Sequence, residues 1–207
     1  MFDTETAGTM GKGRPREFDT AAALDAAMEL FWRRGYEGTS LAALTEATGV
    51  GAPSLYAAFG NKEALFRKAL GRYLERPASY LRKALAAPTA RAVAEQAFRG
   101  AIDMVMRPGA PEGCLLVHGA LASTPTTEAV REELGRLRAA AEAAVRRRFE
   151  RSVAEGDLPP GADPAALARF LMTVIWGMSV QAAGGARRKD LEQVAEVALR
   201  CWPPAGK

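Results

Sequence analysis

Residues 39–62 read TSLAALTEATGVGAPSLYAAFGNK, and this stretch decides how the N-terminal part of the chain folds. The pattern predicts a short helix that stops at Gly49 and a second helix that starts three residues later and tolerates Pro53 in its first turn. Gly49 permits a sharp reversal that would strain a residue with a Cβ. One interpretation of two short helices joined in this way is a helix-turn-helix unit, whose second helix enters the major groove of DNA. The pattern fits an αα-hairpin that only packs against its neighbours equally well.

The apolar spacing around this stretch indicates a small helical core. Leu55 and Phe59 are placed to pack the second short helix onto the first and onto a preceding helix. That preceding helix is expected to begin after Asp19, which can cap it, and to end at Gly35. Asn61 is expected to cap the helix that follows.

The composition favours an all-α protein of ordinary globular type. The chain has 207 residues, which suits one domain or two small ones. It contains 43 Ala but only 11 Val and 2 Ile; Ala is the best helix former, whereas apolar β-branched residues fill sheets. Hydrophobic residues make up 48% and charged residues 25%, which excludes a disordered chain. The net charge of +4 suits an anionic partner without proving one.

The order of these patterns divides the chain into three regions. Residues 1–17 form a polar basic arm, residues 18–64 form a head with the helix-turn-helix unit, and residues 65–207 form a larger helical bundle. About nine helices are expected in all. The segment 163–182 is apolar nearly all round, which suggests burial both in its own core and against a partner. A two-fold interface through the last two long helices would make the chain a homodimer.

Several classes of site and location are disfavoured. Two cysteines, Cys114 and Cys201, cannot build a disulfide framework, and a single histidine argues against an all-protein zinc site. No metal site and no cofactor are expected. The signatures G-x-S-x-G, H-E-x-x-H and the P-loop do not occur, so no enzyme is expected. The chain begins without the apolar core of a signal peptide, and polar residues interrupt the apolar window 165–182, so a cytoplasmic protein that does not span a membrane is expected.

A more specific signal is the string S-L-Y-x-x-F-x-x-K-E-x-L, which runs from Ser54 to Leu65. Further characteristic residues lie in the preceding helices and turns: Ala26-Ala27, Leu30-Phe31, Gly35-Tyr36, Thr39-Ser40, Leu44 and Gly49-Val50. With these residues, the segment 18–70 resembles the N-terminal domain of the TetR/AcrR (tetracycline-repressor-like) family of transcriptional regulators.

The resemblance implies a homodimeric, repressor-type regulator. Its two heads would bind a pseudo-palindromic operator of double-stranded DNA about one helical turn apart, and its C-terminal part would dimerise and hold a small-molecule effector. Thr39 and Ser40 would lie at a helix N-terminus aimed at phosphate. Ser54 and Tyr56 would lie on the recognition helix, and Lys62 would face the DNA backbone. An effector that binds only when the heads are tilted out of register would release the DNA.

The start of the expected recognition helix departs from the family pattern. Gly51, Ala52 and Pro53 stand where the family often has longer polar or basic residues, so bidentate readout by Arg, Asn or Gln is not available there. Specificity is then left to apolar contact with thymine methyl groups, to Ser54 and to the shape of the DNA.

The N-terminal arm offers a second DNA contact. Residues 1–76 hold ten basic and ten acidic residues, so binding must depend on where the cations lie. The run Gly13-Arg14-Pro15-Arg16 is close to the core of an AT-hook, and guanidinium groups are attracted into narrow A·T-rich minor grooves. The alternative is an ordinary solvated tail. We favour the arm interpretation for Arg14 and Arg16, because the run stands just before the helix-turn-helix unit; deleting residues 1–16 is then expected to weaken operator binding and its salt dependence.

The C-terminal part carries candidate effector contacts and two rival functions. The candidates for a pocket that holds a largely apolar effector are Phe98, Ile102, His118 and Trp176, although aromatic residues at helical spacing more often belong to a core. The first rival is a helical bundle that sequesters a small molecule and has no DNA function. The second is an enzyme that uses Cys114 with His118, four residues apart on an expected helix. The arginine run 146–148 is interpreted as a solvated helix face.

Overall fold

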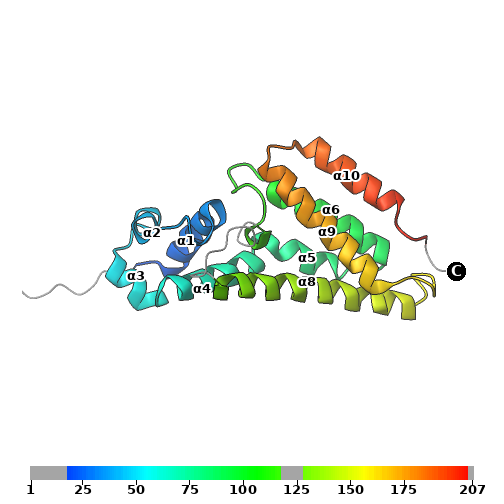
Figure 1. Cartoon of the computed structure of the whole chain (residues 1–207), viewed down its shortest axis with the longest axis horizontal. Coiled ribbons are helices and arrows are strands. Elements are labelled where there is room, and N and C mark those ends of the chain that lie inside the picture. Colours follow the sequence, from blue (N-terminus) through cyan, green and yellow to red (C-terminus); the bar gives the residue numbers. More distant parts are fainter. Residues whose placement is uncertain (1–17, 118–127, 205–207) are drawn as a thin grey trace, which may run out of the picture.

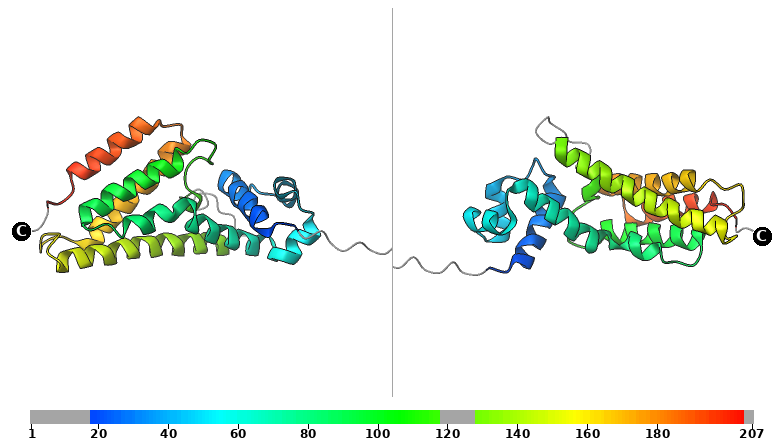
Figure 2. Two further views of the ribbon diagram at one scale, coloured as in Figure 1. Left: turned by 180° about the vertical axis from the view of Figure 1, so that it is seen from behind. Right: turned by 90° about the horizontal axis from the view of Figure 1, so that it is seen from below.

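The computed structural model describes residues 18–117 and 128–204, and all regular secondary structure in these ranges is helical (Figure 1). The expected all-α fold is therefore confirmed. The helices up to residue 75 are called the head below, and the elements from residue 77 onward are called the body. The head lies at one end of an elongated molecule, and the longer helices of the body extend away from it (Figures 1 and 2).

The head consists of α1 (Thr20–Arg34), α2 (Leu41–Thr48), α3 (Ala52–Phe59) and α4 (Lys62–Glu75). Asp19, Ser40 and Asn61 each accept hydrogen bonds from backbone N–H groups in the first turns of α1, α2 and α4. Such caps satisfy donors that a helix leaves unpaired. The caps expected at Asp19 and Asn61 and the helix end expected at Gly35 are confirmed.

Aromatic side chains of α1 pack against those of α4 in the core of the head. Phe31 and Trp32 of α1 are buried. Phe31 packs edge-on against Phe66 of α4 with ring centroids 5.0 Å apart, and Trp32 packs against Tyr73 with centroids 4.9 Å apart. Such pairs contribute about 0.5–1.5 kcal/mol beyond the burial of their area. Helices α1 and α4 therefore form the central pair of the head, and α2 and α3 pack against it.

The body contains the 3-10 turn η1 (Pro77–Ser79) and the helices α5 (Tyr80–Ala84), α6 (Ala90–Val105), α8 (Glu128–Ala154), α9 (Pro164–Ala183) and α10 (Arg188–Arg200). Helix α6 packs against α8, α9 and α10, and α8 and α9 pack on each other. In Figure 1, α10 forms one outer edge of the body and α8 runs along the opposite edge. The short elements η1 and α5 are not expected from the sequence.

Helix α9 is long and apolar enough to cross a membrane by length and composition alone. In this fold it packs against α6, α8 and α10, and its residues Leu171, Met172 and Ile175 are buried in the core. Phe170 and Val180 of the same helix stay exposed. Packing within the chain therefore buries 39% of the apolar window of α9, and another part of this helix is left uncovered in the single chain.

Direct contacts join the head to the body. The indole N–H of Trp32 donates to the carbonyl oxygen of Gly113 at 3.0 Å, and the guanidinium of Arg33 donates to the carbonyl oxygen of Gly109 at 2.7 Å. The hydroxyl oxygen of Tyr73 lies 3.2 Å from the sulfur of Cys114. Because Trp32 and Tyr73 belong to α1 and α4, a rotation of the head has to change these contacts with the segment 109–114.

Asp25 forms the main ion-pair cluster within the head, where α4 ends. The Nε and Nη2 atoms of Arg72 donate to its two carboxylate oxygens at 2.6 and 2.9 Å, and Nη1 of Arg76 donates at 2.8 Å. The hydrogen bonds from Arg72 hold the pKa of the Asp25 carboxyl below its ordinary value of 3.8. The stability that this cluster contributes is therefore fully present above pH 3.8 and is lost as the pH falls through the lowered pKa.

The variant Asp25→Asn is expected to lower the free energy of unfolding by about 1 kcal/mol at neutral pH, because bidentate pairing with a half-buried arginine exceeds the value of an exposed pair. The difference from the wild type should shrink as the pH falls below 3.8 and through the lowered pKa of Asp25, because the carboxyl then becomes neutral in the folded protein too. Urea unfolding over a range of pH measures both effects. Glu95→Gln, which breaks an exposed pair with Arg91, is the control and should cost at most about 0.5 kcal/mol. If the difference in unfolding free energy between Asp25→Asn and the wild type does not change with pH, the ionised carboxylate of Asp25 does not provide this stability.

Gly100 of α6 permits the close approach of α5. A Cβ atom at this position would lie 2.5 Å from Cβ of Tyr80 and 2.9 Å from two of its ring carbons. Gly→Ala in a helix interior ordinarily gains about 1 kcal/mol, but overpacking of this kind costs about 1–3 kcal/mol. We expect Gly100→Ala to destabilise the protein in urea unfolding. Gly71→Ala in α4 is the control: its Cβ meets nothing within 4 Å, so this variant should be more stable than the wild type. If both variants are more stable than the wild type, α5 can move away from the new Cβ atom at position 100 without cost.

Candidate DNA-binding surface

Local hydrogen bonds and one glycine build the turn between α2 and α3. Gly49 has a φ of 67°, in the left-handed region that favours glycine. The Thr48 hydroxyl donates to the carbonyl oxygen of Leu44 at 2.7 Å and accepts from the N–H of Val50 at 3.2 Å. The reversal expected at Gly49 is confirmed, and these bonds hold the two helices at a defined angle.

Helix α3 has one buried and one exposed face. Leu55 and Phe59 point into the head core, as the sequence predicts. Gly51, Pro53 and Ser54 are exposed at the start of the helix, and Ala52 is half-buried. The exposed face continues along the helix through two alanines, at positions 57 and 58. Since residues 52–59 include no charged side chain, this surface carries no charged group of its own.

The first turn of α3 also differs from those of the other head helices. Gly51 is the N-cap residue and provides no side-chain hydrogen bond, whereas α1, α2 and α4 are all capped by side chains. The N-terminal backbone N–H groups of α3 therefore lack an acceptor from the cap residue. Such groups, together with the positive end of the helix dipole, favour a nearby anion such as a phosphate.

Thr39 precedes the N-cap of α2, but its side chain is buried. The residue has no exposed surface, and its hydroxyl donates to the carbonyl oxygen of Gly35 at 2.7 Å. A side chain without exposed surface cannot reach a phosphate, so the expected contact by Thr39 is wrong. The hydrogen bond instead closes the loop between α1 and α2, which positions the neighbouring Ser40.

Ser40, Tyr56 and Lys62 have surface that a partner can reach. Ser40 is exposed; its hydroxyl oxygen accepts from the N–H of Ala43 at 3.1 Å, which leaves the hydroxyl proton for another acceptor. Tyr56 and Lys62 are half-buried. The Lys62 ammonium lies 4.3 Å from the ring centroid of Tyr36, and this partial burial lowers its pKa while the charge of Glu37 acts in the opposite direction. The ring therefore holds the ammonium at the N-terminus of α4.

Lys68 is a second cation on this surface that sequence reasoning missed. Its ammonium lies 5.4 Å from the ring centroid of Phe59 and 3.5 Å from the carbonyl oxygen of Ala58, so it covers the end of α3. No local pattern signals this role, because the contact joins two different helices. Arg14 and Arg16 of the expected arm lie outside the described residues.

The candidate effector residues are only partly brought together. Phe98 and Ile102 of α6 are buried and line a groove of about 340 Å³ between α6 and α10, together with Leu199. Trp176 of α9 is half-buried and does not line this groove. His118 lies outside the described residues. The structure therefore supports a shared surface for two of the four candidates.

Cys114 is poorly suited to act as a nucleophile. Its thiol is buried, and burial raises its pKa although the hydrogen bond with Tyr73 acts in the opposite direction. The reactive form of cysteine is the thiolate, which a raised pKa disfavours. In residues 18–117 and 128–204, no group of three or more His, Cys, Asp or Glu side chains is arranged to hold a metal ion.

Two family models match the chain in the order of its two parts. The model described as "Bacterial regulatory proteins, tetR family" matches residues 23–69, which cover most of the head. The model described as "Tetracyclin repressor-like, C-terminal domain" matches residues 94–197, which cover most of the body.

Curated relatives and a solved structure agree with these matches. The HTH-type transcriptional repressor ComR of Escherichia coli (strain K12) is 39% identical over 194 residues, which cover 93% of this chain and 92% of ComR. The uncharacterized HTH-type transcriptional regulator YezE of Bacillus subtilis (strain 168) is 32% identical, over 77% of this chain and 83% of YezE. A cysteine-substituted variant of the TetR family regulator CifR, complexed with 26-base-pair operator DNA, matches at 47% identity with a TM-score of 0.88, over 92% of this chain and 100% of that chain. The chain thus belongs to the TetR family of bacterial transcriptional regulators.

Proposed function

We propose that the chain represses transcription as a homodimer that binds a pseudo-palindromic operator through its two copies of α3, and that a small-molecule effector releases it. The observation that carries this proposal is the exposed, uncharged face of α3 with Lys62 and Lys68 beside it. An uncharged helix face can enter the major groove, while flanking cations attract the phosphates. The relatives support it, because ComR is a repressor and CifR is complexed with operator DNA.

Each part of the head surface has its own role in this proposal. Residues 51–54 approach the base edges and read thymine methyl groups and groove shape. Ser40, Tyr56 and Lys62 contact the DNA backbone, and Arg14 and Arg16 of the arm enter an adjacent minor groove. Residues 18–64 act as the DNA-binding domain and residues 65–207 as the effector-binding and dimerisation domain. Helix α4 crosses this boundary, so it can transmit a movement of one domain to the other.

The exposed apolar face of α9 and α10 supports the dimer. Phe170, Val180, Val194 and Val197 are the large hydrophobic residues with exposures between 39 and 51% in the described part of the chain. A groove of about 320 Å³ between the two helices continues this face. A second copy of the chain would cover it by the same surface, which is the usual geometry of a two-fold dimer.

The effector is a largely apolar small molecule, for which Phe98, Ile102, His118 and Trp176 are the candidate contacts. The chain has no catalytic role in this proposal, which is supported by the burial of Cys114 and by the regulators among its relatives. A regulator that must reach chromosomal DNA acts in the bacterial cytoplasm.

A mobility-shift and footprinting assay on the DNA upstream of its own gene tests this function. We expect a two-fold symmetric footprint, and a binding constant that falls with salt concentration according to the number of phosphates neutralised. A chain without residues 1–16 should show a smaller salt slope; an unchanged slope would exclude the arm. Binding without sequence preference would instead favour a bundle that sequesters small molecules and has no DNA function.

A further inference from the structure

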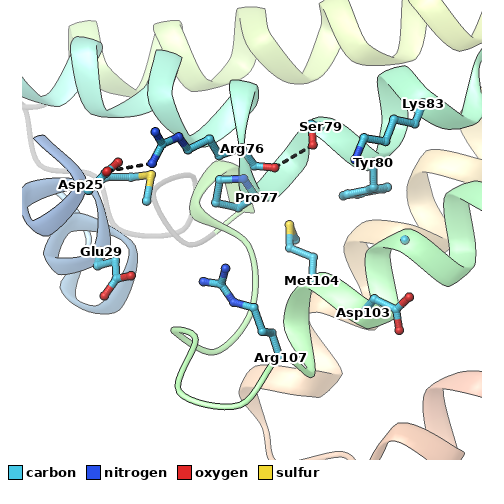
Figure 3. Close-up of a pocket in the computed structure, with 12 residues that line it drawn as sticks. Asp25, Glu29, Arg76, Pro77, Ser79, Tyr80, Lys83, Asp103, Met104 and Arg107 are labelled. Atoms are coloured by element: carbon cyan, nitrogen blue, oxygen red, sulfur yellow. Dashed lines mark hydrogen bonds and ion pairs between the residues drawn. The ribbon is translucent and has the colours of Figure 1, made fainter. Parts of the chain in front are cut away.

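A cavity of about 560 Å³ lies where the head meets the body, apart from the groove between α6 and α10 (Figure 3). Its walls come from three places: α1 of the head, the segment from Arg76 through α5, and the C-terminal half of α6 with Arg107 after it. In Figure 3 the side chains of Met104 and Arg107 extend into the space between these walls. A molecule bound here would touch both the head and the body.

Three acidic and three basic side chains line the cavity, but ion pairs leave more of the cations than of the carboxylates available to a ligand. Asp25 is already paired with Arg72 and Arg76, and Asp103 is paired with Arg188 at 2.8 Å. Lys83 and Arg107 also line the cavity, and neither has an ion-pair partner in residues 18–117 and 128–204. Glu29 is the one lining carboxylate without an ion-pair partner in the same ranges. The cations that remain available thus outnumber the available carboxylates, which favours an anionic ligand.

The rest of the lining suits an apolar group. Met28 of α1 and Met104 of α6 are buried behind the cavity and line it from opposite sides. Methionine side chains adapt to ligands of irregular shape. The phenol of Tyr80 also lines the cavity, and burial raises its pKa, so it stays a neutral hydrogen-bond donor. The lining thus combines charged side chains with an apolar part that includes Met28 and Met104.

We propose that this junction cavity binds a small amphipathic carboxylate, with its carboxylate between Lys83 and Arg107 and its apolar part against Met28 and Met104, and that such a ligand weakens operator binding. The regulatory half of this inference rests on the proposed function. A ligand that contacts α1 and α6 together binds best at one separation of the two helices, so it favours one orientation of the head. By linkage, operator DNA must weaken ligand binding by the same factor.

Calorimetric titration of the full-length protein with 4-phenylbutyrate and hexanoate, each compared with its uncharged primary amide at equal ionic strength, tests the site. We expect saturable binding of at least one carboxylate, one molecule per chain, and affinity for its amide that is lower by about tenfold or more. Arg107→Gln and Lys83→Gln should each weaken carboxylate binding by about tenfold. Both side chains are exposed, so these variants should fold. Arg82→Gln, which removes an exposed charge from α5 outside the cavity, is the control and should bind as the wild type does.

Three results would overturn the site: no saturable binding of either carboxylate, equal binding of the amides, or binding that neither substitution changes. Operator affinity is measured on the same samples with and without ligand, and a carboxylate that binds at the site but leaves this affinity unchanged would overturn its regulatory role. A protein that binds its operator but neither carboxylate loses this inference and keeps the proposed function. A protein that binds a carboxylate here but no operator loses the proposed function and keeps the site.

Discussion

Ser54→Glu is expected to reduce operator affinity by about a thousand-fold. Ser54 lies exposed at the start of α3, so each head of the dimer would bring a new negative charge toward the phosphates. Repulsion of about 2 kcal/mol per head, or about 4 kcal/mol for the dimer, corresponds to that loss. The fold should not suffer, because a carboxylate in the first turn of a helix is favourable. Fluorescence anisotropy with labelled operator measures the affinity, and thermal unfolding verifies the fold.

Ser54→Gln is the matched control, since glutamine has the same size as glutamate and no charge. We expect it to retain most of the operator affinity. If Ser54→Glu binds the operator as tightly as the wild type, α3 does not face the DNA. If both variants lose binding equally, the size of the side chain and not its charge decides the contact.

Val197→Asp is expected to separate the dimer into folded monomers. Val197 of α10 is 51% exposed in the single chain, so the substitution does not disturb the core. In a two-fold interface the carboxylate is buried twice, and each unpaired buried charge costs several kcal/mol. The dissociation constant of the dimer should rise by about a thousand-fold or more. Analytical ultracentrifugation measures this constant directly.

Operator binding should fall together with dimerisation in Val197→Asp, because a monomer can occupy only one half-site at a time. Val197→Thr keeps the shape of the side chain and adds no charge, so it should remain largely dimeric. A Val197→Asp protein that stays dimeric at nanomolar concentration would place the interface elsewhere than on α9 and α10.

Much of the fold can be predicted from the sequence because its signals are local. Asp19 and Asn61 cap their helices by accepting hydrogen bonds from N–H groups two or three residues away. The left-handed backbone conformation at position 49 likewise favours glycine whatever the rest of the fold. The amphipathic spacing of Leu55 and Phe59 likewise identifies the buried face of α3. The short elements η1 and α5 are missed because five residues or fewer provide too little periodicity.

The site depends more on contacts between distant residues, and these cannot be inferred from sequence spacing. Thr39 precedes a helix as a phosphate contact should, but the fold of the loop from Gly35 buries it. Lys68 reaches α3 only because α4 packs beside it. The junction cavity is less predictable still, since α1 and Arg107 are far apart along the chain and are brought together only by the tertiary fold.

Directed cleavage of the operator from α3 shows whether α3 of each copy lies in the major groove of a half-site. An iron chelate is attached to the thiol introduced by Ser54→Cys in a Cys201→Ser background, in which the remaining native cysteine, Cys114, is buried. We expect two centres of DNA cleavage, about 34–36 Å apart along the duplex and related by the two-fold axis of the operator. Bound protein that cleaves at no defined position, or at one centre only, would contradict this placement of α3.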